Sequence, residues 1–147
     1  MLGNPLVFDW EMIMSGSSKA LIEGIYAAFA AGDMAAFTNA LAPDIVWNEA
    51  ENYPYADRNP YRGAQQIIEG VFGRTAEDWD GFAVQMNDFV DGGDRVVAMG
   101  RYSGTHKETG KKLDVQAAHV WTIENDKVVR FQQYIDTLGT ARAMGAS

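Results

Sequence analysis

The stretch LDVQAAHVWTIENDKVVRFQQYID, residues 113–136, alternates apolar and polar side chains on both sides of the polar tetrad ENDK. Alternation with a period of two is typical of a β-strand that buries one face. A short polar join between two such runs predicts an antiparallel hairpin of strands 113–123 and 128–136. Two more runs of this kind, 82–89 and 95–105, come before it with similarly short joins. The second half of the chain therefore predicts a four-stranded antiparallel meander.

The first half of the chain predicts helices. An apolar stripe at helical spacing indicates a first helix, which Gly32 ends, and it consists of Leu21, Ile22, Ile25, Tyr26 and Phe29. Asp33 then caps a second helix that runs to about residue 41. A third helix, 63–73, follows a short strand, 45–49. Helices first and a meander second indicate the α+β class, in which helices cover one face of a sheet.

Length and charge narrow the classes of function. The chain of 147 residues suits one domain, predicted over 17–147, behind an N-terminal extension, 1–16, to which no role is assigned. The formal net charge is −8 and no dense basic patch occurs, which argues against nucleic-acid binding. No apolar run approaches the roughly 20 residues that span a bilayer, and no Lys or Arg precedes Lys19. A cytoplasmic protein without membrane contact is expected.

Several kinds of catalytic centre are not expected. The chain has no cysteine, which excludes disulfides and thiol chemistry. Its two histidines lie thirteen residues apart, and without cysteine they do not predict a metal site. Neither a dinucleotide-binding fingerprint nor a G-x-S-x-G nucleophile elbow occurs, and no cofactor is predicted.

Two polar side chains lie on strand faces that are otherwise apolar. Glu49 shares a face with Ile45 and Trp47, and His119 shares one with Val115, Ala117, Trp121 and Ile123. Burying a carboxylate or an imidazole costs several kcal/mol unless the group finds a partner or shifts its pKa. Two such groups in one small chain predict a cavity with a polar floor.

Five local strings follow one another in a recognisable order and spacing. They are Tyr26–Asp33 (YAAFAAGD), Leu41–Trp47 (LAPDIVW), Tyr61–Gly63 (YRG), Ala118–Trp121 (AHVW) and Lys127–Asp136 (KVVRFQQYID). Together they resemble the NTF2-like superfamily, specifically its SnoaL-like and ketosteroid-isomerase-like branch, over about residues 18–138. The resemblance implies a cone-shaped α+β barrel with three N-terminal helices packed on a curved, mostly antiparallel sheet. It also implies a pocket between helices and sheet, and a homodimer through the outer sheet face.

The resemblance further implies functional positions, although the family carries out different reactions. Glu49 occupies the place of the ketosteroid-isomerase base, an Asp after the first strand. His119 stands where those enzymes have a protonated Asp and where SnoaL-like cyclases have a His. Tyr26 lies beside the position of the oxyanion-hole Tyr, which is Ile25 here. Gln133 replaces the later Asp that works with this His in the cyclases, so that His–Asp pair is incomplete, and the triad of limonene-epoxide-hydrolase-like members is absent.

These features predict a cofactor-independent isomerase, cyclase or lyase that does acid–base chemistry next to a carbonyl of a mostly apolar substrate. In this hypothesis Glu49 moves the proton, and His119, with Tyr26 or Gln133, stabilises the enolate oxygen. The side chains expected to bind the substrate are Tyr26, Phe29, Trp47, Tyr53, Tyr55, Trp121, Phe131 and Gln133.

A second interpretation is a non-catalytic protein that binds a small ligand in the same pocket. Glu49 then faces water or pairs with Arg58 or Arg62, and His119 is a core side chain satisfied by a backbone carbonyl or a tyrosine. The tyrosines of the loop 50–62 form either a lid over the pocket or ordinary packing.

A third interpretation is an assembly protein whose dimer surface matters more than its cavity. The alternate face of strand 113–123 carries side chains typical of a sheet interface, Gln116, Ala118, Val120 and Thr122. Which face of strand 95–105 points inward is open, so Met99, Arg101 and Tyr102 have no assigned role. Asp136 is interpreted as a structural cap or an ion-pair acid.

Overall fold

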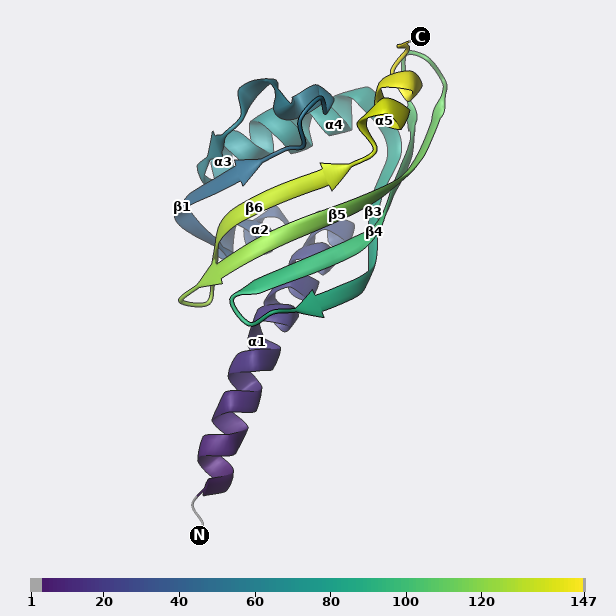
Figure 1. Cartoon of the computed structure of the whole chain (residues 1–147). Helices are drawn as coiled ribbons and strands as arrows, with labels where there is room; N and C mark the ends of the chain where they lie inside the picture. The colour runs from purple at the N-terminus through teal and green to yellow at the C-terminus, as the bar shows by residue number, and fades with distance from the viewer. Residues whose placement is uncertain (1–3, 147) are drawn as a thin grey trace.

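The computed structural model describes the backbone of residues 4–146 and the side chains of residues 18–146. Its centre is a curved six-stranded sheet in the order β2-β1-β6-β5-β4-β3, with the helices gathered on one side (Figure 1). All neighbouring strands are antiparallel except β1 and β6, which are parallel. The predicted α+β class and mostly antiparallel sheet are confirmed.

The predicted meander is confirmed with slightly longer strands. They are β3 (Trp79–Asp91), β4 (Arg95–His106), β5 (Lys112–Glu124) and β6 (Lys127–Ile135). In the β5–β6 turn Asn125 and Asp126 have φ angles of 52° and 62°. Two central residues with positive φ match the twist of the flanking strands, and Asn and Asp tolerate this conformation. The hairpin therefore forms where the sequence placed it, and it aligns His119 with Gln133.

The predicted helices form with different bounds. Helix α1 (Asn4–Ala31) ends at Gly32, whose φ is 69°, and the Asp33 side chain accepts a hydrogen bond from the Ala36 N–H at the start of α2 (Met34–Asn39). The predicted third helix does not end at residue 73. It consists of α3 (Gly63–Ile67), a π-helical turn (Ile68–Phe72) and α4 (Gly73–Asp78). The helical backbone of α1 includes part of the predicted extension 1–16, whose side chains lie outside the described residues.

Strand β1 (Leu41–Asn48) is longer than predicted and begins before Pro43. The register between β1 and β6 shifts between Leu41 and Val46, and a shift of this kind tolerates a residue without a backbone N–H. The strand ends at Asn48, one residue earlier than predicted, so Glu49 lies directly after it.

The loop 50–62 contains a 3-10 helix (Pro54–Arg58) and the short strand β2 (Tyr61–Arg62), neither of which was predicted. Helix α5 (Thr137–Ala143) was also missed. The interpretation of Asp136 as a structural cap is confirmed, because its Oδ1 accepts a hydrogen bond of 2.9 Å from the Gly139 N–H at the start of α5.

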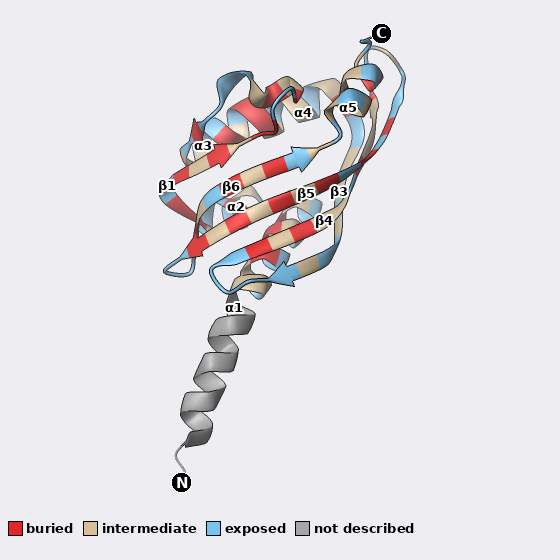
Figure 2. Ribbon diagram, in the orientation of Figure 1, coloured by how far each residue is buried: buried red, intermediate tan, exposed pale blue. Residues whose placement is uncertain are grey.

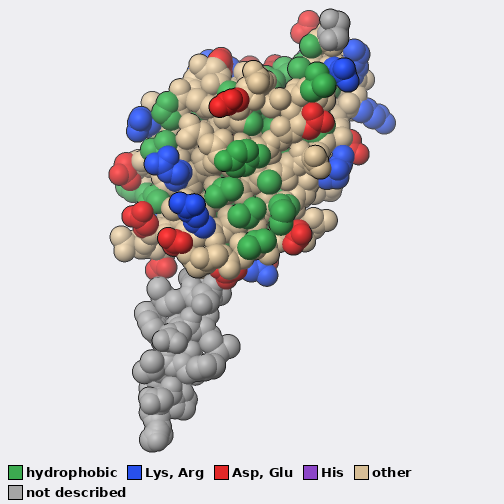
Figure 3. Space-filling view, in the orientation of Figure 1, with side chains coloured by type: hydrophobic (Ala, Val, Ile, Leu, Met, Phe, Trp, Pro, Cys, Tyr) green, Lys and Arg blue, Asp and Glu red, His purple; other side chains and the backbone are tan. Residues whose placement is uncertain are grey.

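The two faces of the sheet differ as the alternation on β5 predicts. The side chains from Val115 to Ile123 at every second position are buried, and the intervening ones are half-buried or exposed (Figure 2). Apolar side chains gather on the face away from the helices (Figure 3), where Tyr134 is 57% exposed. The homodimer through this face stays a prediction. Within the described part of the chain, every helix is too short or too polar to cross a membrane.

Candidate functional site

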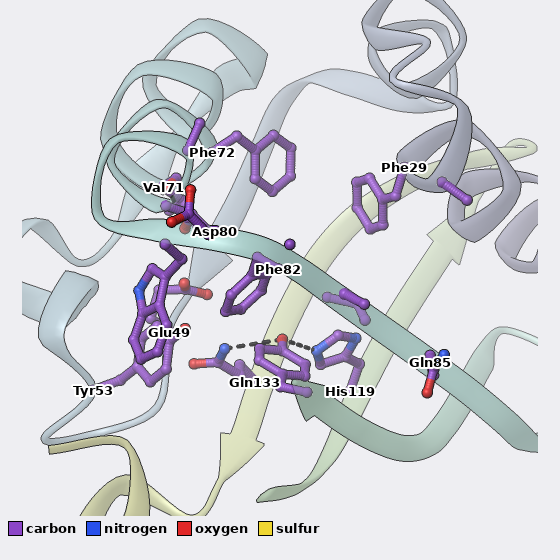
Figure 4. A pocket seen from close by; sticks show the side chains of 18 of the residues that line it. Phe29, Glu49, Tyr53, Val71, Phe72, Asp80, Phe82, Gln85, His119 and Gln133 are labelled. Carbon is purple, nitrogen blue, oxygen red and sulfur yellow. Dashed lines mark hydrogen bonds between the residues drawn. The ribbon is translucent and has the colours of Figure 1, made fainter. Parts of the chain in front are cut away.

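A cavity of about 830 Å³ lies between the helices and the inner face of the sheet. Most of its wall is apolar and aromatic, including Phe29 from α1, Phe72 from the π-helical turn and Phe82 from β3. Figure 4 shows Phe29 and Phe72 on one side of the cavity, and His119 and Gln133 on the other. An apolar cavity of this size with a few convergent polar groups is typical of a small-molecule site.

Most of the side chains predicted to form the site do line this cavity. They are Phe29, Trp47, Glu49, Tyr53, His119, Phe131 and Gln133. Tyr26 and Trp121 are not part of the cavity wall and lie behind His119. Tyr55 is also outside the wall, because its hydroxyl donates a hydrogen bond of 2.6 Å to Asp78 and accepts one from Trp79. These three side chains were expected to contact a ligand, and the structure gives them packing positions instead.

The tyrosines of the loop 50–62 are not an exposed lid. Tyr53, Tyr55 and Tyr61 are 4%, 3% and 1% exposed, respectively. Tyr61 donates a hydrogen bond to the Tyr55 carbonyl and accepts one from Arg74, which holds the loop against the π-helical turn and α4. Of these rings, Tyr53 alone reaches the cavity wall.

Glu49 is 3% exposed and lies in the cavity wall. Its Oε2 accepts a hydrogen bond of 3.0 Å from Trp47 Nε1. Its backbone is held by Asn59, which accepts from the Glu49 N–H at 3.0 Å and donates to the Glu49 carbonyl at 2.8 Å. Neither of the two ion pairs formed by described residues involves Glu49. The side chain is therefore neither solvent-facing nor paired with Arg58 or Arg62.

Burial controls the charge of Glu49. It raises the pKa of the carboxyl group to about 8, against smaller lowering effects of the Trp47 hydrogen bond and the Arg74 charge. The group is thus mostly a neutral carboxylic acid at pH 7, and it can lose or gain its proton close to that pH.

His119 is 2% exposed, and both of its ring nitrogens have protein partners. Nδ1 lies 2.5 Å from the Tyr26 hydroxyl, and Nε2 lies 2.5 Å from the Tyr102 hydroxyl. Burial lowers the pKa of His119 to about 3, so the imidazole is neutral around pH 7. The predicted direct hydrogen bond from His119 to a ligand oxygen therefore has no free ring nitrogen to make it.

Gln133 connects the two polar groups of the cavity floor. Its Oε1 accepts a hydrogen bond of 3.0 Å from the Ala50 N–H, next to Glu49. Its Nε2 donates one of 3.0 Å to the Tyr102 hydroxyl, which also contacts His119. The sequence suggested that Gln133 either holds a ligand carbonyl or satisfies His119 or Tyr26. The structure shows it satisfying Tyr102.

The model of the SnoaL-like domain matches residues 22–131, which include Glu49, Tyr102 and His119 and end two residues before Gln133. The chain belongs to the SnoaL-like family. The predicted resemblance is thereby confirmed, and the NTF2-like fold that comes with it is supported by solved structures of similar shape.

Three relatives of this SnoaL-like chain illustrate the likeness. An NTF2-like protein from Burkholderia thailandensis E264 is 40% identical, with a TM-score of 0.83 over 86% of this chain and 96% of that one. A protein from Jannaschia sp. CCS1, described as a SnoaL-like polyketide cyclase, is 18% identical, with a TM-score of 0.70 over 86% and 92% of the two chains, and it shares the fold. An uncharacterised protein from Mycobacterium tuberculosis H37Rv is 28% identical over 78% of this chain and 85% of its own length.

Several residues that line the cavity of this SnoaL-like domain were not predicted from the sequence. Tyr102 on β4 had no assigned role, yet it is 5% exposed and lines the cavity. Trp79 at the start of β3 also lines it, and exposed Asp80, Gln85 and Lys107 add polar groups to the wall. Among the described residues, no group of three or more His, Asp or Glu side chains is placed to hold a metal ion.

Proposed function

We propose that this cavity binds a mostly apolar carbonyl compound and moves a proton at the carbon next to the carbonyl, without a cofactor. The reaction is of the isomerase, cyclase or lyase type. The observation that carries the proposal is the buried Glu49 carboxyl group in the cavity wall, with Trp47 as its hydrogen-bond donor and no ion-pair partner among the described residues.

Glu49 suits this chemistry because the pKa of its carboxyl group, about 8, lies near neutral pH. The carboxylate removes a proton from the α-carbon, the C–H electron pair moves into the C–C bond, and the carbonyl oxygen gains the charge. The resulting carboxylic acid then returns the proton, either to the same carbon or to a conjugated one. A base of pKa about 8 is a stronger proton acceptor than an ordinary carboxylate and is still ionised in part at pH 7.

The cavity wall supports the substrate class. Aromatic rings such as Phe29, Phe82 and Phe131 suit a flat apolar body, while the polar groups concentrate on the floor. Lys107 and Asp80 are exposed where they meet the cavity, so a polar substituent of the substrate fits beside them. The description of the Jannaschia protein as a polyketide cyclase is in keeping with a carbonyl substrate, although that likeness concerns the fold alone.

A non-catalytic ligand-binding protein is the second candidate. One observation favours it: both ring nitrogens of His119 are occupied by tyrosine hydroxyls, as expected of a core histidine. The same cavity would then hold an apolar ligand without proton transfer.

The two functions differ in a hydrogen-exchange assay in D₂O. The protein is incubated with 2-acetylnaphthalene, 1-tetralone and cyclohexenone, and loss of the α-proton signals is followed by NMR. We expect exchange above the buffer rate for at least one ketone. Its rate should rise with pH up to about 8 and then level off, because the carboxylate of Glu49 is the form that accepts the proton. Line broadening by binding without added exchange would identify a binding protein instead.

A further inference from the structure

The cluster around His119 fixes where its hydrogens lie. A neutral imidazole has one N–H donor and one nitrogen that accepts. Because His119 is neutral and contacts a tyrosine hydroxyl at each nitrogen, one tyrosine must donate to it and the other must accept from it. One of the two tyrosines therefore has an O–H that does not donate to His119.

The Tyr26 end of the cluster decides the tautomer. The Tyr26 oxygen already accepts a hydrogen bond of 2.9 Å from Trp121 Nε1, and the only described acceptor for its own O–H is His119 Nδ1. If Nδ1 carried the proton, two N–H groups would point at the Tyr26 oxygen, and its largely buried hydroxyl hydrogen would have no acceptor among the described residues. An unsatisfied buried donor is unfavourable. Tyr102 lines the cavity, where a ligand or water can accept its hydrogen, whereas Tyr26 does not line it. The tautomer that leaves the free O–H on Tyr102 is therefore favoured, so Nδ1 accepts and Nε2 carries the proton.

The Tyr102 end follows from that assignment. His119 Nε2–H donates to the Tyr102 oxygen at 2.5 Å, and Gln133 Nε2 donates to the same oxygen at 3.0 Å, as the dashed lines in Figure 4 mark. The orientation of the Gln133 amide is fixed, because its Oε1 accepts from the Ala50 backbone N–H. The Tyr102 oxygen thus accepts hydrogen bonds from two N–H donors, and its own hydroxyl hydrogen has no acceptor within the cluster.

We propose that Tyr102 directs this free O–H into the cavity and donates a hydrogen bond to the substrate's carbonyl oxygen. Tyr102 lines the same cavity as Glu49, so the donor and the proton-transfer group meet one ligand. Tyr26, His119 and Gln133 are positioning residues that aim the hydroxyl. The identity of the acceptor as a carbonyl rests on the proposed function, whereas the direction of the hydroxyl does not.

The two hydrogen bonds that the Tyr102 oxygen accepts make its hydroxyl group a stronger hydrogen-bond donor. Accepting hydrogen bonds polarises the O–H bond, and the low-dielectric surroundings make a fixed donor more effective towards developing negative charge. Burial keeps the pKa of Tyr102 well above its usual value, so the hydroxyl keeps its proton throughout the neutral range.

The tautomer of His119 can be measured without any ligand. Long-range ¹H–¹⁵N correlation spectra of the uniformly labelled protein distinguish a protonated from an unprotonated ring nitrogen, and through-bond assignment separates His119 from His106. We expect a single Nε2–H tautomer of His119 from pH 5 to pH 8. An Nδ1–H form or an even mixture would overturn the proposal, because the Tyr102 hydroxyl would then donate its hydrogen bond to His119 Nε2 and not to the substrate.

The role of Tyr102 towards the substrate is tested with the ketone that exchanges fastest. We expect Tyr102→Phe to lower the maximal exchange rate by about 10²–10³-fold with little change in KM, because an oxyanion donor acts mainly in the transition state. Tyr134→Phe, the same substitution at a 57% exposed tyrosine, should leave the rate unchanged. An unchanged rate in Tyr102→Phe refutes the donor role. If no ketone exchanges while the Nε2–H tautomer is present, the proposed reaction fails and the direction of the hydroxyl stands.

Discussion

Replacing Glu49 with glutamine is expected to lower α-proton exchange by about 10²–10⁴-fold, the usual contribution of a positioned acid–base group. Glutamine has the shape of the neutral carboxylic acid, and its Oε1 can still accept the hydrogen bond from Trp47 Nε1. The substitution therefore removes the transferable proton while keeping the cavity wall. Substrate affinity should change much less than the maximal rate, because the neutral amide replaces a group that is mostly neutral at pH 7.

Glu51→Gln is the matched control for this prediction. Glu51 lies two residues further along the chain and is exposed, so the same chemical change at that position should leave exchange unaltered. Rates for both variants are measured in D₂O at several ketone concentrations, which separates the maximal rate from KM. Equal exchange by the wild-type protein and Glu49→Gln would remove Glu49 from the reaction.

The stability of the protein should depend on pH in a way that Glu49→Gln abolishes. The folded-state pKa of Glu49 is raised by burial to about 8, above its ordinary value of 4.5. Between these values the folded state holds a proton that the unfolded state releases, so the free energy of unfolding falls as the pH rises. The loss is about 1.4 kcal/mol per pH unit and about 4–5 kcal/mol over the whole window.

His119 changes the free energy of unfolding with pH in the opposite direction. Its folded-state pKa is lowered by burial from 6.5 to about 3, so the stability that comes from its neutral form is lost as the pH falls below about 6.5. Between about pH 4.5 and 6.5 the two slopes oppose each other and largely cancel. The wild-type protein should therefore be most stable in that interval and lose stability towards pH 8.

The comparison of wild-type protein with Glu49→Gln isolates the first effect, because His119 contributes equally to both. Urea unfolding at intervals from pH 4.5 to 8.5 gives the difference in the free energy of unfolding. We expect the two proteins to be similar near pH 4.5, and Glu49→Gln to become progressively more stable above it. A constant difference across this range would mean that Glu49 has an ordinary pKa in the folded protein.

The parts of the fold that depend on local chemistry were predictable from the sequence. Gly32 and Asp33 end one helix and begin the next because one tolerates positive φ and the other offers a side-chain acceptor. The ENDK turn sets the β5–β6 register because Asn125 and Asp126 tolerate positive φ. The alternating pattern placed Glu49 and His119 among apolar side chains and so indicated their burial, with a solvent-facing Glu49 as the alternative; both are less than 4% exposed.

The missed features depend on contacts between distant parts of the chain. The helix continues through Gly73 into α4, where Arg74 bonds Asp57 and Tyr61 from the preceding loop. Helix α5 buries Ala143 in a cluster with Leu113 and Val115 of β5. The partners of His119 come from α1 and β4, so the sequence could not show that its nitrogens are occupied. For Tyr102 a signal was present: Arg101, its neighbour, is suited to the solvent face, which places Tyr102 inward.

A titration of the Glu49 carboxyl group shows whether this group exchanges its proton near neutral pH. The protein is labelled with ¹³C at the side-chain carboxyl of glutamate, and the signal missing from Glu49→Gln identifies Glu49 among the eight glutamates. Its chemical shift is followed from pH 3 to pH 10. A midpoint near 8 is the result expected of a buried carboxylic acid that exchanges its proton near neutral pH. A midpoint near 4.5 would show an ordinary ionised carboxylate and contradict the proposed proton transfer.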